Sequence, residues 1–108
     1  MKLDRNDPDR AGLGKYALIN MRRYRALPGD QLAEAHALLD RLQDLGIIDK
    51  GVRGASDEFF VLKLKDKYAP AALTAYANAA VDDDKELATQ VLELASRAEH
   101  HPDKKRPD

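Results

Sequence analysis

Residues 56–80 read SDEFFVLKLKDKYAPAALTAYANAA, and this stretch decides the fold class of the 108-residue chain. It holds both Phe residues and two of the four Tyr residues, beside a ladder of lysines and an alanine-rich run. Two periodicities overlap in it. Read with period two, Phe60, Leu62 and Leu64 share one face, as in a strand of about seven residues. Read with the helical period, apolar side chains fall near one stripe: Phe59, Leu62, Ala69, Leu73, Tyr76 and Ala80.

The helical interpretation is favoured because of what flanks these residues. The Ser56 hydroxyl can cap a helix, and two carboxylates follow it at the positive end of the helix dipole. A strand would find its only partner at residues 47–53, where Gly51 interrupts, and an isolated two-stranded ribbon is marginally stable. Pro70 inside a helix costs about 3 kcal/mol. We therefore expect one helix over 57–66 and another over 68–81, with a short hairpin around 47–65 in an α+β fold as the alternative.

Helical spacing of apolar residues continues on both sides of this stretch. It predicts helices over 13–27, 31–45 and 84–98, with Pro28 and Gly46 beyond the ends of the first two. The expected buried positions of the 31–45 helix are Leu32, Ala35, Leu39 and Leu42. Residues 1–12 are expected to form a flexible arm and residues 99–108 a flexible polar tail. The sequence thus predicts a single, mainly α domain over 13–98, a compact bundle of about four or five helices.

Composition narrows the class of protein. Hydrophobic residues make up 44% of the chain and aromatic residues only 6%, so the core should consist of Leu, Ala, Val and Ile. The absence of Cys excludes disulfides and thiolate chemistry and is typical of a reducing compartment. The N-terminus is too polar for a signal peptide, and no apolar run approaches the roughly 20 residues that span a bilayer. We expect a cytoplasmic protein with no membrane attachment.

Residues with catalytic or metal-binding chemistry do not converge. His100 and His101 are adjacent, so their side chains point apart and make a poor chelate. His36 has no second His or Cys one helical turn away and is interpreted as a helix-surface residue. Asp82, Asp84 and Glu86 are explained by the dipole of the helix that follows them. We therefore expect a protein that is not an enzyme and holds neither metal nor cofactor.

Two basic groups are candidates for binding nucleic acid or a protein partner. The first consists of Arg22, Arg23 and Arg25 beside tyrosines, and the second of Lys63, Lys65, Lys67 and Tyr68. A pI near 6.3 and acidic segments between the groups argue for weak nucleic-acid binding at most. For the arginines a structural interpretation is favoured over nucleic-acid binding, because Arg22 and Arg25 could pair with acidic residues of the next helix such as Glu34 and Asp40.

The strings EFFVLKLKDKYAPAALTAYANAA, DDDKELATQVLELASRA and KRPD resemble small proteins of unknown function encoded by phages and prophages, and GKYALINMRRYRAL extends the resemblance towards the N-terminus. The resemblance implies a setting in which such proteins bind a host or viral macromolecule, and it transfers no functional residue. We expect a noncatalytic interaction protein with a protein partner. Self-association is a second route, because small side chains let another helix approach closely: Ala72, Ala75, Ala79 and Ala80.

Overall fold

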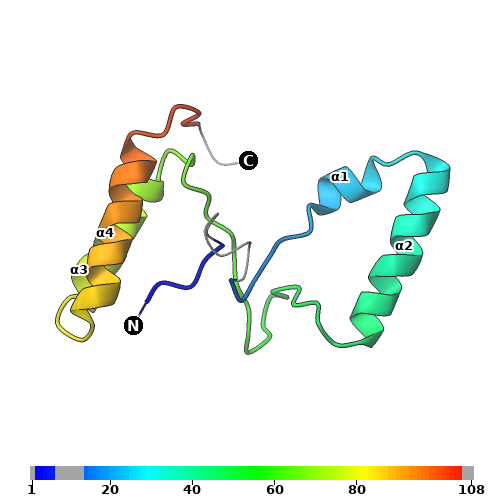
Figure 1. Ribbon diagram of the computed structural model, residues 1–108, viewed down its shortest axis with the longest axis horizontal. Helices are drawn as coiled ribbons and strands as arrows, with labels where there is room; N and C mark the ends of the chain where they lie inside the picture. The colour runs from blue at the N-terminus through cyan, green and yellow to red at the C-terminus, as the bar shows by residue number, and fades with distance from the viewer. Residues whose placement is uncertain (1, 7–13, 106–108) are drawn as a thin grey trace. The chain divides into compact units, whose positions relative to one another are not determined.

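The computed structural model describes residues 2–6 and 14–105 of the chain. Within these residues it is mainly helical, as predicted, with four helices and no strand (Figure 1). The helices are α1 (Met21–Arg25), α2 (Gly29–Asp44), α3 (Ala69–Ala80) and α4 (Lys85–Glu99). Contacts divide the chain into two units. The α1–α2 unit comprises residues 16–60, and the α3–α4 unit comprises residues 61–108 together with residues 1–15.

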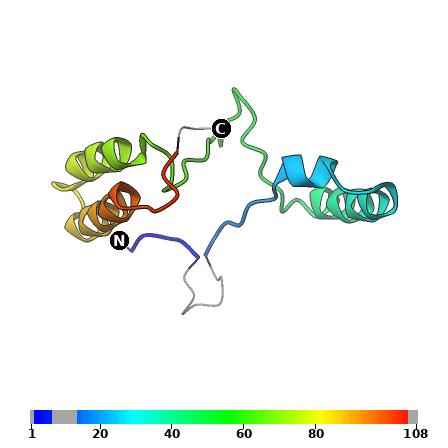
Figure 2. The ribbon, with the colours of Figure 1, turned by 90° about the horizontal axis from the view of Figure 1, so that it is seen from above.

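The α3–α4 unit contains all the buried hydrophobic residues of the described chain. The two helices lie side by side as an antiparallel hairpin (Figures 1 and 2). Alanines allow their close approach, and the buried residues are Ala69, Ala77, Leu87, Ala88, Val91, Ala95 and Ala98. Asp84 begins α4, because its carboxylate accepts a hydrogen bond from the Leu87 amide at 3.1 Å. This bond lowers the pKa of Asp84 below its ordinary value of 3.8.

Segments remote in sequence join this helix pair. The Leu3 amide donates to Gln90 Oε1 of α4 at 2.6 Å, and the Leu3 side chain packs against the core cluster. Near the other terminus, Lys105 lies beside the chain that leads into α3, since its amide donates to the Lys65 carbonyl at 2.8 Å. Residues 1 and 7–12 of the expected arm and residues 106–108 of the expected tail lie outside the described residues.

The expected helix over residues 57–66 is wrong, and the hairpin around 47–65 does not form within the described residues either. Pro70 instead lies in the first turn of α3, where its missing N–H costs nothing. Upstream, Gly51 has φ +62° and its Cα lies under the Phe59 ring, so close that a β-carbon would come within 2.7 Å of ring atoms. The run of aromatic and β-branched residues that begins at Phe59 therefore follows a turn at Gly51 and forms neither a helix nor a strand.

The first helix is shorter than the predicted 13–27. Its start is fixed by Asn20, whose side-chain oxygen accepts from the Arg23 amide at 3.0 Å. Asn hydrogen-bonds neighbouring backbone groups and is therefore favoured at caps over helix interiors. The prediction for the second helix is confirmed to within two residues, and Gly46, with φ +75°, follows its end as expected.

Candidate interaction surface

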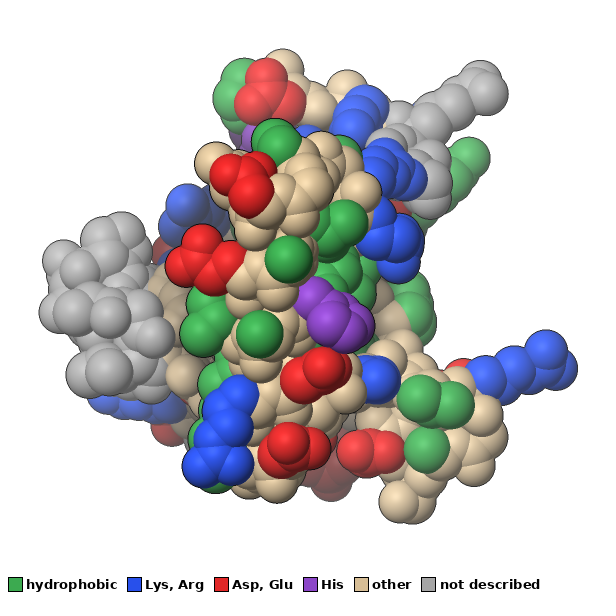
Figure 3. All heavy atoms as spheres, turned by 90° about the vertical axis from the view of Figure 1, so that its right-hand side faces the viewer, with side chains coloured by type: hydrophobic (Ala, Val, Ile, Leu, Met, Phe, Trp, Pro, Cys, Tyr) green, Lys and Arg blue, Asp and Glu red, His purple; other side chains and the backbone are tan. Residues whose placement is uncertain are grey.

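The α1–α2 unit has no buried residue among those described, although its sequence is amphipathic. The expected buried face of α2 is only half-buried. Leu38 is 61% exposed and Leu45 54%, and Ile47 beyond the helix is 64% exposed. Figure 3, viewed from the side of α2, shows hydrophobic side chains between acidic and basic ones. We call Leu38, Leu45 and Ile47 the α2 apolar patch.

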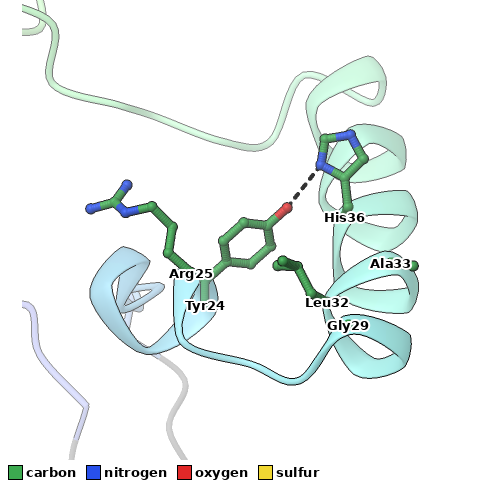
Figure 4. A pocket seen from close by; sticks show the side chains of 6 residues that line it. All are labelled: Tyr24, Arg25, Gly29, Leu32, Ala33 and His36. Atoms are coloured by element: carbon green, nitrogen blue, oxygen red, sulfur yellow. Dashed lines mark hydrogen bonds between the residues drawn. The ribbon is translucent and has the colours of Figure 1, made fainter.

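A hydrogen-bonded chain of three side chains holds α1 on α2 (Figure 4). The Tyr24 hydroxyl lies 2.9 Å from His36 Nδ1, and His36 Nε2 lies 3.3 Å from Asp40 Oδ2. With Nε2–H directed at Asp40, Nδ1 is free to accept the Tyr24 proton. The expectation of a helix-surface His36 holds in that its side chain is 66% exposed. Its partner Tyr24, which lies twelve residues earlier, was missed.

The order Tyr24, His36, Asp40 resembles that of a nucleophile, a base and an orienting carboxylate in an enzyme. Its surroundings do not fit such chemistry, because solvent reaches both His36 and Asp40. The adjoining pocket is an open groove along α2, lined by Tyr24, Arg25, Gly29, Leu32, Ala33 and His36 (Figure 4). We therefore assign these three hydrogen-bonded side chains a structural role, in which they position α1 against α2.

The arginines of α1 remain available to a partner. Arg22, Arg23 and Arg25 are exposed, and within the described residues no ion pair joins them to an acidic side chain. The expected pairing of Arg22 and Arg25 with Glu34 and Asp40 is wrong, since Asp40 pairs with His36 one turn earlier on its own helix. Three positive charges thus lie within one short helix of the α1–α2 unit.

The lysine group belongs to the α3–α4 unit, so the structure does not bring it together with the arginines in one unit. Lys63 is exposed and Lys65 is half-buried. The Lys67 ammonium lies 5.9 Å from the centroid of the Tyr68 ring, and the Lys67 amide donates to the Lys105 carbonyl at 2.6 Å. Of the three lysines, Lys67 therefore helps to hold the segment before α3 in place through its backbone amide.

A further feature is the run of backbone from Phe59 to Lys63, which we call the open segment. Within the described chain, none of its five N–H groups donates a hydrogen bond, and the carbonyls of its first four residues accept none. Phe60 is 85% exposed and Val61 48%. The strand that the period-two pattern offered as an alternative does not form here.

Metal ligands and membrane spans are both lacking in the described part of the chain. No group of three or more His, Asp or Glu side chains there could hold a metal ion, and His100 lies 2.9 Å from the Ser96 carbonyl through Nδ1. No helix among residues 2–6 and 14–105 is long and apolar enough to cross a bilayer. Comparisons with protein-family models, curated proteins and solved structures gave no match.

Proposed function

We propose that this chain is a noncatalytic interaction protein that binds a host or viral macromolecule or a second copy of itself. The observation that carries the proposal is the α1–α2 unit, in which large apolar side chains stay exposed and none is buried. Burying one Leu stabilises a contact by about 1.5–3 kcal/mol, so the α2 apolar patch offers a partner several such contributions. The resemblance to phage and prophage proteins supports a setting in the host cytoplasm.

The arrangement of the patch supports binding over scattered exposure. Leu38 of α2 and Leu45, the C-cap residue of α2, are about two helical turns apart and therefore lie on one side of the helix. A unit of this size, without a disulfide, gains little stability from its own packing. A partner that covers the patch would supply apolar burial that the unit itself does not provide.

The test compares two neighbouring substitutions in the full chain. Leu38→Asp places a charge in the patch, whereas Ala37→Asp places the same charge on an exposed position about a quarter turn away. We expect Leu38→Asp to weaken capture of a partner, or self-association, at least about tenfold, because one buried Leu is worth that factor or more. Light scattering and affinity capture measure it, with circular dichroism confirming equal helix content.

The outcomes separate cleanly. If the two substitutions weakened partner capture or self-association equally, the α2 apolar patch would not be part of the interaction surface. A wild-type chain that stays monomeric and captures nothing would refute the interaction function itself.

A second candidate function is nucleic-acid binding through Arg22, Arg23 and Arg25, with Lys63, Lys65, Lys67 and Tyr68 as a further group. The exposed guanidinium groups without ion pairs among the described residues favour it. Phosphate contacts release counterions, so affinity should rise as salt is lowered. Replacing the three arginines by Ala should abolish retention on single-stranded DNA at low salt.

The control for this test removes the same charge from the same unit by replacing Arg41, Lys50 and Arg53 with Ala. It should keep most of the binding. Absence of any binding by the wild-type chain at low salt would rule the nucleic-acid function out.

A further inference from the structure

One side of α2 carries a seam of residues at heptad spacing. Its members follow one another at intervals of four, three, four and three residues, and we call them the α2 seam: Gln31, Ala35, Leu38, Leu42 and Leu45. These spacings are those of the a and d positions of a heptad, which keep one side of a helix turned towards a second helix. Leu38 and Leu45 of the α2 apolar patch both occupy d positions of this seam.

The helix α1 leaves the α2 seam uncovered. Tyr24 of α1 bonds to His36, and the groove beside this contact is lined on α2 by Gly29, Leu32, Ala33 and His36 (Figure 4). Ala33 and His36 occupy f and b positions of the heptad, on the side of the helix opposite the a and d positions. No member of the seam lines that groove, and none of the five is buried.

Two opposite charges border the seam along one flank. Glu34 and Arg41 occupy its g positions, from which side chains reach across to a neighbouring helix. Both are exposed, and within the part of the chain that the structure describes neither takes part in an ion pair. They are seven residues apart, about 10 Å along the helix, which is too far for a pair between them. Charges that complement both can come only from another helix.

A second copy of α2 supplies these charges when it runs antiparallel to the first. In an antiparallel pair the g positions of one helix lie beside the g positions of the other. A two-fold axis that passes between residues 36 and 37 places Ala35 opposite Leu38 of the second copy. The same axis places Glu34 beside Arg41 of the second copy and Arg41 beside Glu34 of the second copy. Both charges of each chain are then paired.

This register also completes the apolar contact along the seam. Leu42 lies opposite Gln31 of the second copy, and Leu45 lies opposite Pro28 of the second copy. Leu38 is 61% exposed in the single chain and Leu45 is 54% exposed, so that pairing covers the two large side chains that the chain leaves open. Burial of these side chains supplies most of the driving force for association.

Other arrangements of two α2 helices lack the charge pairs. An antiparallel pair shifted by one heptad brings Arg41 beside Arg41 of the second copy, and like charges repel. A parallel pair places the g positions beside e positions, which are Leu39 and Gly46. The charges of the flank therefore select one direction and one register.

We propose that α2 pairs with α2 of a second copy as a short antiparallel coiled coil in this register. This inference rests on the proposed interaction function and names its partner as the same chain. The contact is isologous, as is usual for homodimers. Because the paired helices are short, the dimer should dissociate on dilution.

Charge reversal in the full chain tests the register by sedimentation velocity at low ionic strength, where surface charges are least screened. The wild type should dimerise as its concentration rises. Glu34→Lys places a positive charge beside Arg41 of the second copy, and Arg41→Glu places a negative charge beside Glu34 of the second copy. Each should weaken dimerisation about three- to tenfold, because two exposed pairs change from attraction to repulsion.

Two combinations of these substitutions should restore dimerisation. A chain that carries both Glu34→Lys and Arg41→Glu has exchanged its charges, so it regains both pairs and should dimerise about as strongly as the wild type. An equal mixture of the two single variants should form a heterodimer more readily than either forms a homodimer. In that mixture one chain brings two positive g positions and the other brings two negative ones.

The control for these variants is Asp44→Lys, at an exposed c position that faces away from the seam. It makes the same change in net charge as Glu34→Lys and should leave dimerisation unchanged. Circular dichroism checks that all variants have equal helix content. A dimer that neither single reversal weakens, or that the combined reversals do not restore, would overturn the proposed register.

The failures of this inference and of the proposed function are distinguishable. A wild-type chain that is monomeric at every concentration refutes the α2 pairing, and the interaction function then depends on capture of another macromolecule. A dimer that Leu38→Asp weakens and both charge reversals leave unchanged refutes the antiparallel register while supporting the interaction function through the α2 apolar patch.

Discussion

At the residue scale, Asp84 shows how one side chain sets both an element boundary and a response to pH. Its carboxylate accepts from the Leu87 amide at 3.1 Å at the start of α4. That bond favours the ionised form, and it lowers the pKa of Asp84. The contribution of this carboxylate to stability is therefore complete above pH 3.8 and is lost as the pH falls through the lowered pKa.

We predict that Asp84→Ala lowers the thermal midpoint of unfolding at neutral pH, because the cap is lost. Asp84→Asn keeps an acceptor for the Leu87 amide and should retain most of the stability. Because Asn does not ionise, this variant should lack the loss of stability that protonation of Asp84 causes at low pH. Thermal unfolding from neutral pH to about pH 2 measures both effects. A wild type and an Asp84→Asn variant with parallel pH profiles would contradict the assignment.

At the element scale, the α3–α4 contact depends on alanines. Ala77 and Ala98 are fully buried, and small side chains at such positions let two helices approach closely. From the sequence, Ala72, Ala75, Ala79 and Ala80 were expected to let another helix approach closely. The buried members of the run serve internal packing, while Ala72, Ala75 and Ala79 are exposed.

We predict that Ala77→Leu destabilises the chain by about 1–3 kcal/mol, because the added carbons overpack a closed contact. Ala79→Leu makes the same chemical change on an exposed face of the same helix and should have little effect. Denaturant unfolding followed by circular dichroism compares the two. Equal stabilities of the variants would mean that α3 does not pack on α4 through Ala77.

The elements also show what the sequence could predict. α2 and α4 follow from regular apolar spacing and from local end signals such as Gly46 and Asp84, which act within one turn. The structure of residues 57–66 could not be predicted in this way, because their apolar pattern fits both a helical and a strand period. The arrangement of Phe59 over Gly51 also depends on contact across a loop. Likewise, the sequence identifies the cluster of arginines, but no pattern in it predicts the hydrogen bond between Tyr24 and His36.

At the scale of the whole molecule, the two units differ in how much apolar surface they bury. α4 contains five buried residues and α2 contains none. Local opening costs little where few apolar contacts are buried. The α3–α4 unit therefore carries the core, and the α1–α2 unit leaves large apolar side chains exposed.

We predict that amide hydrogen exchange is faster in α2 than in α4 at low protein concentration, by at least about tenfold, since α2 lacks buried contacts. Mass spectrometry of peptic fragments resolves the difference between the two helices. Uniform protection across the two helices would contradict the division into a stable and a labile unit.

The hydrogen bond from Leu3 to Gln90 joins residues 87 positions apart, and this has a consequence for synthesis. Ribosomes add about 5–20 residues per second, so the Leu3 segment waits on the order of ten seconds for its partner helix to be made. The α1–α2 unit is translated well before that contact can close. A nascent chain therefore exposes the α2 apolar patch before the α3–α4 unit, which holds the buried core, exists.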